Sequence, residues 1–97
     1  MNELNPRPIF NDQIAKPNLG RINGLLNEVL IERGYQHQKF HGTQLHDPVA
    51  WLAILGEEVG EVNRAVVEND RANYRHELIQ VAATAIAAVE ALDLTGA

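Results

Sequence analysis

The feature that most constrains the fold is an apolar run near the end of the chain, from Leu78 to Val89. Its only polar residues are Gln80 and Thr84, and alanine fills much of the rest. A helix that is apolar all round is buried all round. The chain has only 97 residues, and three helices in so small a domain cannot surround one of their own members. We therefore expect this helix to pack against helices of a second copy, with the alanines permitting close approach. The alternative is a monomer with an alanine-rich exposed face.

The first part of the chain divides into an arm, a helix and a loop. Residues 1–17 include three prolines without sustained periodicity, so we expect an extended N-terminal arm followed by a single domain over residues 18–97. Asn18 is a good N-cap residue, and after it apolar residues recur at steps of three and four up to Leu30. The segment from Gly34 to His46 is predicted to be a loop, with its first few residues still able to continue the helix.

Two further helices follow this loop. Asp47 is a suitable N-cap and Pro48 suits the first helical position, so a second helix is predicted from there to about Glu68. Asp70 caps a third helix, which should end near Asp93. No strand-like alternation is present, and aromatic residues make up only 5% of the chain. The predicted fold class is all-α: a helical hairpin or bundle of three main helices, completed by oligomerisation.

Composition excludes several classes of function. The chain has no cysteine, which removes disulfides, zinc–thiolate sites and thiol catalysis. A net charge of −5 argues against a nucleic-acid partner, although metal ions can still join an acidic protein to a polyphosphate. The N-terminus has no apolar signal core, and the apolar run is shorter than the roughly 20 residues that a bilayer requires. We expect a cytoplasmic protein without a membrane partner.

Acidic residues occupy an unexpected place on the second helix. At about 100° per residue, Glu58 falls in the middle of the apolar stripe, Glu61 on the same face toward one edge, and Glu57 near solvent. An uncompensated carboxylate in that position costs several kcal/mol or becomes protonated. A cation between the carboxylates would relieve this cost. The apolar residues sharing the face of Glu58 are Trp51, Ile54, Leu55, Val62 and Ala65.

The third helix repeats the pattern, with Glu77 on its packed face and Gln80 three residues further on. In an antiparallel hairpin these two side chains can face Glu58 and Glu61. Oxygen ligands of this kind favour Mg²⁺, which keeps several waters and bridges to substrate phosphates. The residues expected to share the packed face of Glu77 are Tyr74, Val81, Thr84, Ala85, Ala88 and Leu92.

Two other interpretations remain open at this point. The glutamates of the second helix are surface charge if the apolar stripe is displaced toward Leu52, Val59 and Val66. The histidines of the loop suggest a zinc site if that segment is helical, although Gly42 nearby and the lack of cysteine argue against it. These histidines are His37, His41 and His46.

The acidic residues also resemble a known signature. Glu57-Glu58-Val59-Gly60-Glu61, with Glu77 after a short interval, is similar to the EExxE…ExxD signature of the MazG-like all-α nucleotide pyrophosphohydrolases. The similarity covers roughly residues 30–93. Its flanking segments are Glu32-Arg33 with Gln36, Lys39 and Phe40, then residues 51–61, then residues 76–83.

The resemblance implies a homodimer or homotetramer of helical hairpins that uses Mg²⁺, or Mn²⁺ in its place. The implied reaction is hydrolysis of a nucleoside triphosphate to the monophosphate and pyrophosphate, in a housecleaning role. Glu58, Glu61 and Glu77 match metal-ligand positions, and Glu57 matches the first position, an outer ligand or water-positioning base. Gln80 stands where the signature has Asp, which leaves a non-catalytic nucleotide- or metal-binding oligomer as an alternative. A purely structural helical module is a third hypothesis.

Residues that would hold the rest of the substrate are less specific. Phe40, His41 and Trp51 are candidates for stacking on the base, although Trp51 also suits a core position. Any one of the basic residues is also typical of an ordinary surface charge. The cations available for the phosphates are Lys39, Arg64, Arg71 and Arg75.

Overall fold

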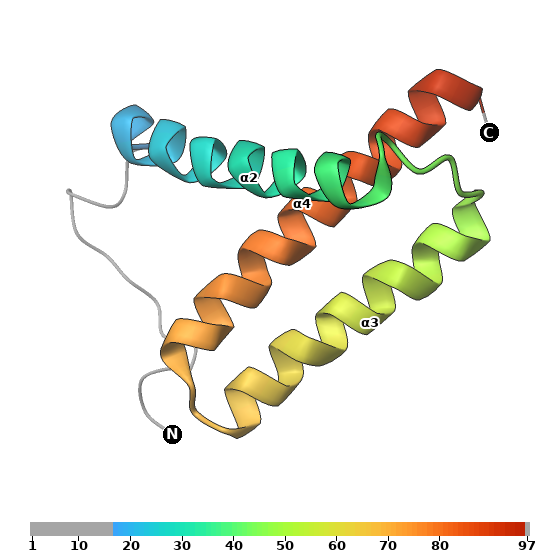
Figure 1. Cartoon of the computed structure of the whole chain (residues 1–97). Coiled ribbons are helices and arrows are strands. Elements are labelled where there is room, and N and C mark those ends of the chain that lie inside the picture. The colour runs from blue at the N-terminus through green and yellow to red at the C-terminus, as the bar shows by residue number, and fades with distance from the viewer. Residues whose placement is uncertain (1–16, 97) are drawn as a thin grey trace.

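The structure, a computed structural model, describes residues 17–96. These residues form three helices, α2 (Leu19–Phe40), α3 (Pro48–Val67) and α4 (Arg71–Thr95), and contain no strand. The predicted all-α fold is confirmed (Figure 1). Residues 1–16, which make up nearly all of the predicted arm, lie outside the described part of the chain.

The helices begin where the sequence predicts. Asn18, Asp47 and Asp70 are the N-caps of α2, α3 and α4. Each side chain accepts a hydrogen bond from the backbone N–H three residues further on, at 2.9, 2.8 and 3.1 Å respectively. These bonds satisfy backbone donors that lack a partner in the first helical turn. A capping side chain thus determines where each of the three helices begins.

The end of α2 differs from the prediction. The segment from Gly34 was expected to be mainly loop, but the helix continues through Phe40. A Cβ at Gly34 would meet nothing within 4 Å, so this glycine is an ordinary, if weak, helical residue. The chain leaves the helix only at His41 (φ 58°) and Gly42 (φ 115°), both in the left-handed region.

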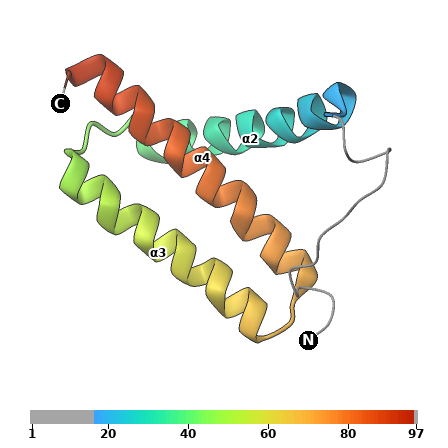
Figure 2. The same cartoon turned by 180° about the vertical axis from the view of Figure 1, so that it is seen from behind.

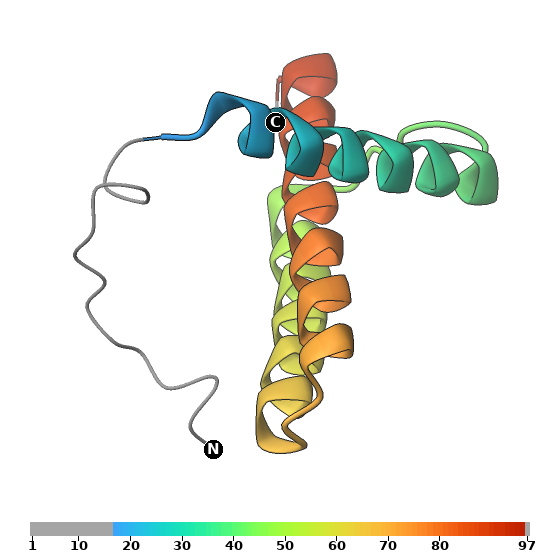
Figure 3. The same cartoon turned by 90° about the vertical axis from the view of Figure 1, so that its left-hand side faces the viewer.

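Helices α3 and α4 pack side by side as an antiparallel hairpin, joined by the short turn at 68–70. The expected hairpin is therefore confirmed. Helix α2 packs on α4 and crosses it steeply, while the backbones of α2 and α3 stay apart (Figure 3). The three helices thus form an open arrangement in which α4 is the central element.

The core is small and rich in alanine. On α4 it consists of Ala83, Thr84, Ala87 and Ala91, which face the other two helices. The predicted packed face of α4 was therefore placed partly wrong: Thr84 is buried, but Ala85 and Leu92 are exposed. The reason is that α2 and α3 cover the same side of α4.

Much apolar surface remains uncovered in the described part of the chain. Leu52, Leu78, Val89 and Leu92 are among the large side chains that stay exposed. Helix α4 is, by length and composition alone, the one described helix that could cross a membrane, and only 22% of its apolar window is buried. Core helices of soluble proteins share this length and composition.

Candidate functional site

A cavity of about 400 Å³ lies between the C-terminal half of α2, the loop after it and the α3–α4 hairpin. Its walls combine charged, amide and aromatic side chains, so a polar or charged ligand would suit it better than an apolar one. Helix α2 contributes Glu32, Arg33, Tyr35, Gln36, Lys39 and Phe40; the loop contributes Gly42, Gln44 and His46; the hairpin contributes Trp51, Ile54, Glu58, Gln80 and Thr84.

A hydrogen-bond network fixes the wall formed by α2 and the loop. The buried guanidinium of Arg33 donates from Nε to Glu90 on α4 (3.1 Å) and from Nη1 to Gln36 (2.7 Å). Thr43 Oγ1 donates to the other Glu90 oxygen at 3.3 Å and lies 3.0 Å from Nε2 of His37. One carboxylate on α4 therefore holds both α2 and the loop in place.

Glu58 stands in a strongly acidic environment. Its side chain is half-buried on α3 and lines the cavity. Burial raises the pKa of Glu58 above its ordinary value, and the charges of Glu77, Glu57, Glu61 and Glu32 raise this pKa further. Carboxylates from all three helices thus disfavour the ionised form of Glu58. A bound cation would stabilise that ionised form.

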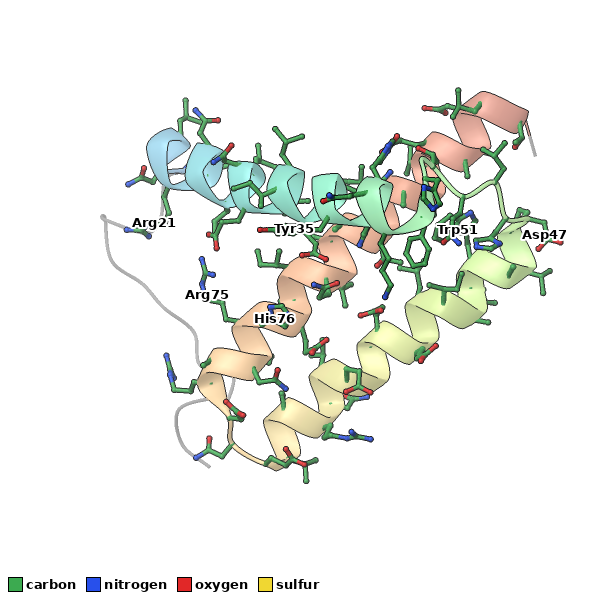
Figure 4. The ribbon with its side chains drawn as sticks, viewed as in Figure 1. Arg21, Tyr35, Asp47, Trp51, Arg75 and His76 are labelled. Atoms are coloured by element: carbon green, nitrogen blue, oxygen red, sulfur yellow. The ribbon has the colours of Figure 1, made fainter. Side chains whose placement is uncertain are left out.

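Trp51 forms part of the apolar end of the cavity. It is 7% exposed, and His46 meets its ring edge-on with centroids 5.1 Å apart. Its indole Nε1 is buried and has no hydrogen-bond partner among the described residues. A buried donor without a partner costs about 1–3 kcal/mol, so this atom is a candidate contact for a ligand acceptor. Figure 4 shows Trp51 on the first part of α3, near the end of α2.

The structure brings five of the residues proposed from sequence to this cavity. Lys39 and Phe40 lie on α2, with Lys39 Nζ 5.2 Å from the Phe40 ring centroid. Trp51 and Glu58 come from α3, and Gln80 comes from α4. The site therefore combines cationic, aromatic and oxygen-bearing side chains from all three helices.

The other two glutamates proposed as metal ligands lie beside this group without lining the cavity. Glu61 and Glu77 are half-buried and close enough to raise the pKa of Glu58. Glu61 also has Arg64 as an ion-pair partner at 3.8 Å on the same helix. In the alternative displaced stripe, Leu52 is 71% and Val59 46% exposed, while Val66 is half-buried. The structure thus places Glu58 nearer the packed side than Leu52 or Val59.

The remaining proposed residues lie elsewhere. Glu57, His41 and Arg71 are exposed and do not line the cavity. Arg75 donates two hydrogen bonds to Glu28, at 2.7 and 2.6 Å, and joins α4 to α2 (Figure 4). This bidentate pair lowers the pKa of Glu28 and places Arg75 in a contact between helices.

Sequence reasoning proposed Lys39 but missed other cavity residues of α2, because it ended this helix too early. Once the helix continues, Glu32, Tyr35, Gln36 and Lys39 follow each other at the spacing of one helical face. That spacing was visible in the sequence. The other missed residues depend on the path of the loop and on how the helices pack; they are Arg33, Gly42, Gln44, His46, Ile54 and Thr84.

No ready-made metal cluster is present within residues 17–96: no three His, Asp or Glu side chains converge on one point. His37 is hydrogen-bonded to Thr43, and His46 contacts Trp51. The charged groups that act on Glu58 are all carboxylates, whose oxygens suit a hard cation such as Mg²⁺.

Comparison with known proteins found no similar protein: no family model, no curated protein and no solved structure matches the chain. The resemblance to the MazG-like signature therefore rests on the quoted residues alone.

Proposed function

We propose that this chain is a Mg²⁺-dependent nucleoside triphosphate pyrophosphohydrolase of the MazG-like kind, cytoplasmic and acting on unwanted nucleotides. The observation that carries the proposal is the position of Glu58, a half-buried carboxylate that lines a cavity and is surrounded by further carboxylates. Such a perturbed acidic group in a cavity is typical of a functional site.

The donor set fits Mg²⁺. Glu58, Glu61 and Glu77 come from both helices of the hairpin, and the charges of Glu61 and Glu77 act on Glu58. A shared ion would require these three side chains to converge from the positions they hold in the structure. When bound, Mg²⁺ supplies charge for the triphosphate and lowers the pKa of an attacking water. Gln80 adds a neutral oxygen from the cavity wall. Glu57 matches the first position of the signature, but it is exposed outside the cavity, so the proposal gives it no role in positioning the water.

The rest of the cavity suits a nucleotide. A volume of about 400 Å³ lies within the range of small-molecule sites. Lys39 provides a positive charge for a phosphate, and Phe40 and Trp51 provide apolar surface for a base. The unpartnered indole N–H of Trp51 would donate to a ring nitrogen or carbonyl of that base.

One observation favours a second candidate function. Gln80 lines the cavity where the signature has Asp, and an amide is a poor base. A non-catalytic protein that binds a nucleotide or a metal ion would keep the same cavity. In either case we propose that the protein is a homo-oligomer, because α4 leaves much of its apolar surface uncovered.

Pyrophosphate release tests the catalytic proposal. The full chain is incubated with Mg²⁺ and a panel of standard and modified deoxynucleoside triphosphates. We expect turnover of at least one substrate, loss of turnover on removing Mg²⁺, and loss in Glu58→Gln. Glu68→Gln, an exposed change at the end of α3, is the matched control and should stay active.

The outcomes separate the two functions. Turnover that survives Glu58→Gln contradicts the catalytic assignment. Calorimetry with Mg²⁺ and a non-hydrolysable triphosphate analogue identifies the second function, which predicts saturable binding without turnover. Absence of both turnover and binding contradicts both and leaves a structural role.

A further inference from the structure

The α3–α4 hairpin has two unlike faces. The first carries the cavity and is crossed by α2, while the second is not covered by α2 (Figure 2). A shallow apolar groove of about 300 Å³ runs along the second face. Leu52 and Leu55 line it from α3, and Val89 and Leu92 line it from α4. Apolar side chains that protrude in this way are typical of a protein interface.

The stripe that α4 presents on this face is symmetric in sequence about Ala85. Counting outward from Ala85 in either direction gives the same residue types at three, four and seven residues. Steps of three, four and seven keep side chains on one helical face. None of these side chains is buried, and Val89 is 56% and Leu92 49% exposed. The pairs are Ala82 and Ala88, Val81 and Val89, and Leu78 and Leu92.

Such symmetry matches a two-fold contact between identical helices. In an isologous interface residue i of one copy meets residue j of the other, and j meets i. Two antiparallel α4 helices crossing at Ala85 would therefore bring Val81 of one copy against Val89 of the other, and Leu78 against Leu92. Each contact would join two residues of the same type. The alanines at the centre let the backbones approach, and the larger residues pack further out. The stripe also carries no charge, although the chain has a net charge of −5.

We propose that two copies of this chain pair through α4, antiparallel, about a two-fold axis at Ala85. The proposal names the surface for the self-association proposed above and rests on it; it is independent of the catalytic assignment. The exposed Leu52 of α3 lines the groove together with Val89 and Leu92 of the stripe and widens the contact. Because the cavity lies on the other face, each copy keeps its cavity open to solvent.

A lipid bilayer suits this helix less well. Glu77 and Glu90 lie on α4 itself, and Glu90 is bonded to the buried Arg33. Charged residues within membrane helices are costly, and a bilayer would have to accommodate both of these. A second copy covers the apolar stripe without moving either glutamate out of its present environment.

Sedimentation of the full chain with Ala85→Glu is the first test. Two glutamates would meet at the axis without a partner, so we expect the dissociation constant of the dimer to rise roughly a hundredfold or more. Ala53→Glu is the matched control, since Ala53 is an exposed helical alanine on α3 outside the stripe. It should sediment like the wild type. Far-UV circular dichroism verifies that both variants remain helical.

Disulfide trapping tests the register and does not depend on the charge variant. The chain has no cysteine, so Ala85→Cys introduces a single thiol that faces its own copy across the axis. We expect a covalent dimer under oxidation, and none from Ala53→Cys. Leu78→Cys mixed with a tagged Leu92→Cys chain should form mixed dimers in preference to dimers of either variant with itself.

Each failure has a distinct meaning. A wild-type chain that stays monomeric, or that partitions into lipid vesicles in place of pairing, overturns both the self-association and this surface. An oligomer that tolerates Ala85→Glu, or that gives no Ala85→Cys disulfide, overturns this surface while leaving self-association standing. Pyrophosphate release in these variants reports separately on the catalytic proposal.

Discussion

Arg33 on α2 and Glu90 on α4 are 57 residues apart in the sequence, and the buried guanidinium of Arg33 contacts the partly exposed carboxylate of Glu90 at 3.0–3.1 Å. The backbone of α2 lies close to α4 and not to α3, so the position of α2 depends mainly on α4. The same carboxylate also accepts a hydrogen bond from Thr43 in the loop. One side wall of the cavity therefore depends on this pair.

Replacing Arg33 by Met should destabilise the protein by about 2–3 kcal/mol, because Glu90 loses its charged partner while the volume is largely kept. Urea unfolding followed by circular dichroism measures the change. Arg21→Met, an exposed arginine near the start of the same helix, should change the stability by no more than about 0.5 kcal/mol. Equal effects of the two substitutions would contradict a special role for Arg33.

The raised pKa of Glu58 predicts a pH-dependent stability. The folded protein holds a proton on this group at a pH where the unfolded chain, with the ordinary pKa of 4.5, has released it. Stability contributed by the protonated form is therefore lost as pH rises from 4.5 through the raised pKa. In EDTA, Glu58→Gln should be more stable than the wild type at neutral pH, and this advantage should shrink below pH 4.5.

Glu57→Gln is the control for that measurement, because Glu57 is the neighbouring exposed carboxylate. We expect it to have the smaller effect at every pH. Denaturant unfolding at a series of pH values gives the comparison. If the wild type is more stable than Glu58→Gln at neutral pH without any divalent ion, Glu58 is not in an unfavourable environment.

Two glycines near the end of α2 should respond in opposite directions to alanine. Gly34 lies inside the helix with open space around its Cβ position, so Gly34→Ala should stabilise by about 0.5–1 kcal/mol. Gly42 has φ 115°, where a Cβ is strained, so Gly42→Ala should destabilise by about 1 kcal/mol or more. Thermal unfolding of both variants measures this difference. A loss of stability in Gly34→Ala would mean that the helix ends before Phe40.

Trp51 is the only tryptophan of the chain and lines the cavity, so its fluorescence reports on ligand binding. Addition of a nucleoside triphosphate with Mg²⁺ should shift or quench its emission. Trp51→Phe keeps an aromatic ring but removes the indole N–H, and calorimetry should show nucleotide binding weakened about tenfold, the effect of one lost hydrogen bond. Unchanged affinity in this variant would show that the indole N–H does not contact the nucleotide.

The sequence predicted the helices well because their starts are local. Asn18, Asp47 and Asp70 each cap a helix through their own side chains, and such bonds need no tertiary context. The hairpin followed from the short turn at 68–70. The end of α2 could not be placed in the same way, because Gly34 suits a helix interior as well as a stop.

The candidate site was only partly predictable. Glu58 stood out because a carboxylate interrupts an apolar stripe, and Gln80 was found through its spacing from Glu77. Gln44 and Thr84 carry no such signal, since they reach the cavity only through the path of the loop and the packing of α4. The packed face of α4 was misjudged for a related reason: alanine lies on all its sides, so periodicity could not tell which side the neighbours would cover.

The central claim is that carboxylates from α3 and α4 share one cation, and Mg²⁺ calorimetry tests it most directly. We predict saturable binding to the wild type, strong weakening in both Glu58→Gln and Glu77→Gln, tighter binding in Gln80→Asp, and wild-type affinity in Glu68→Gln. Binding that is unaffected by Glu77→Gln, or no binding at all to the wild type, would contradict the account.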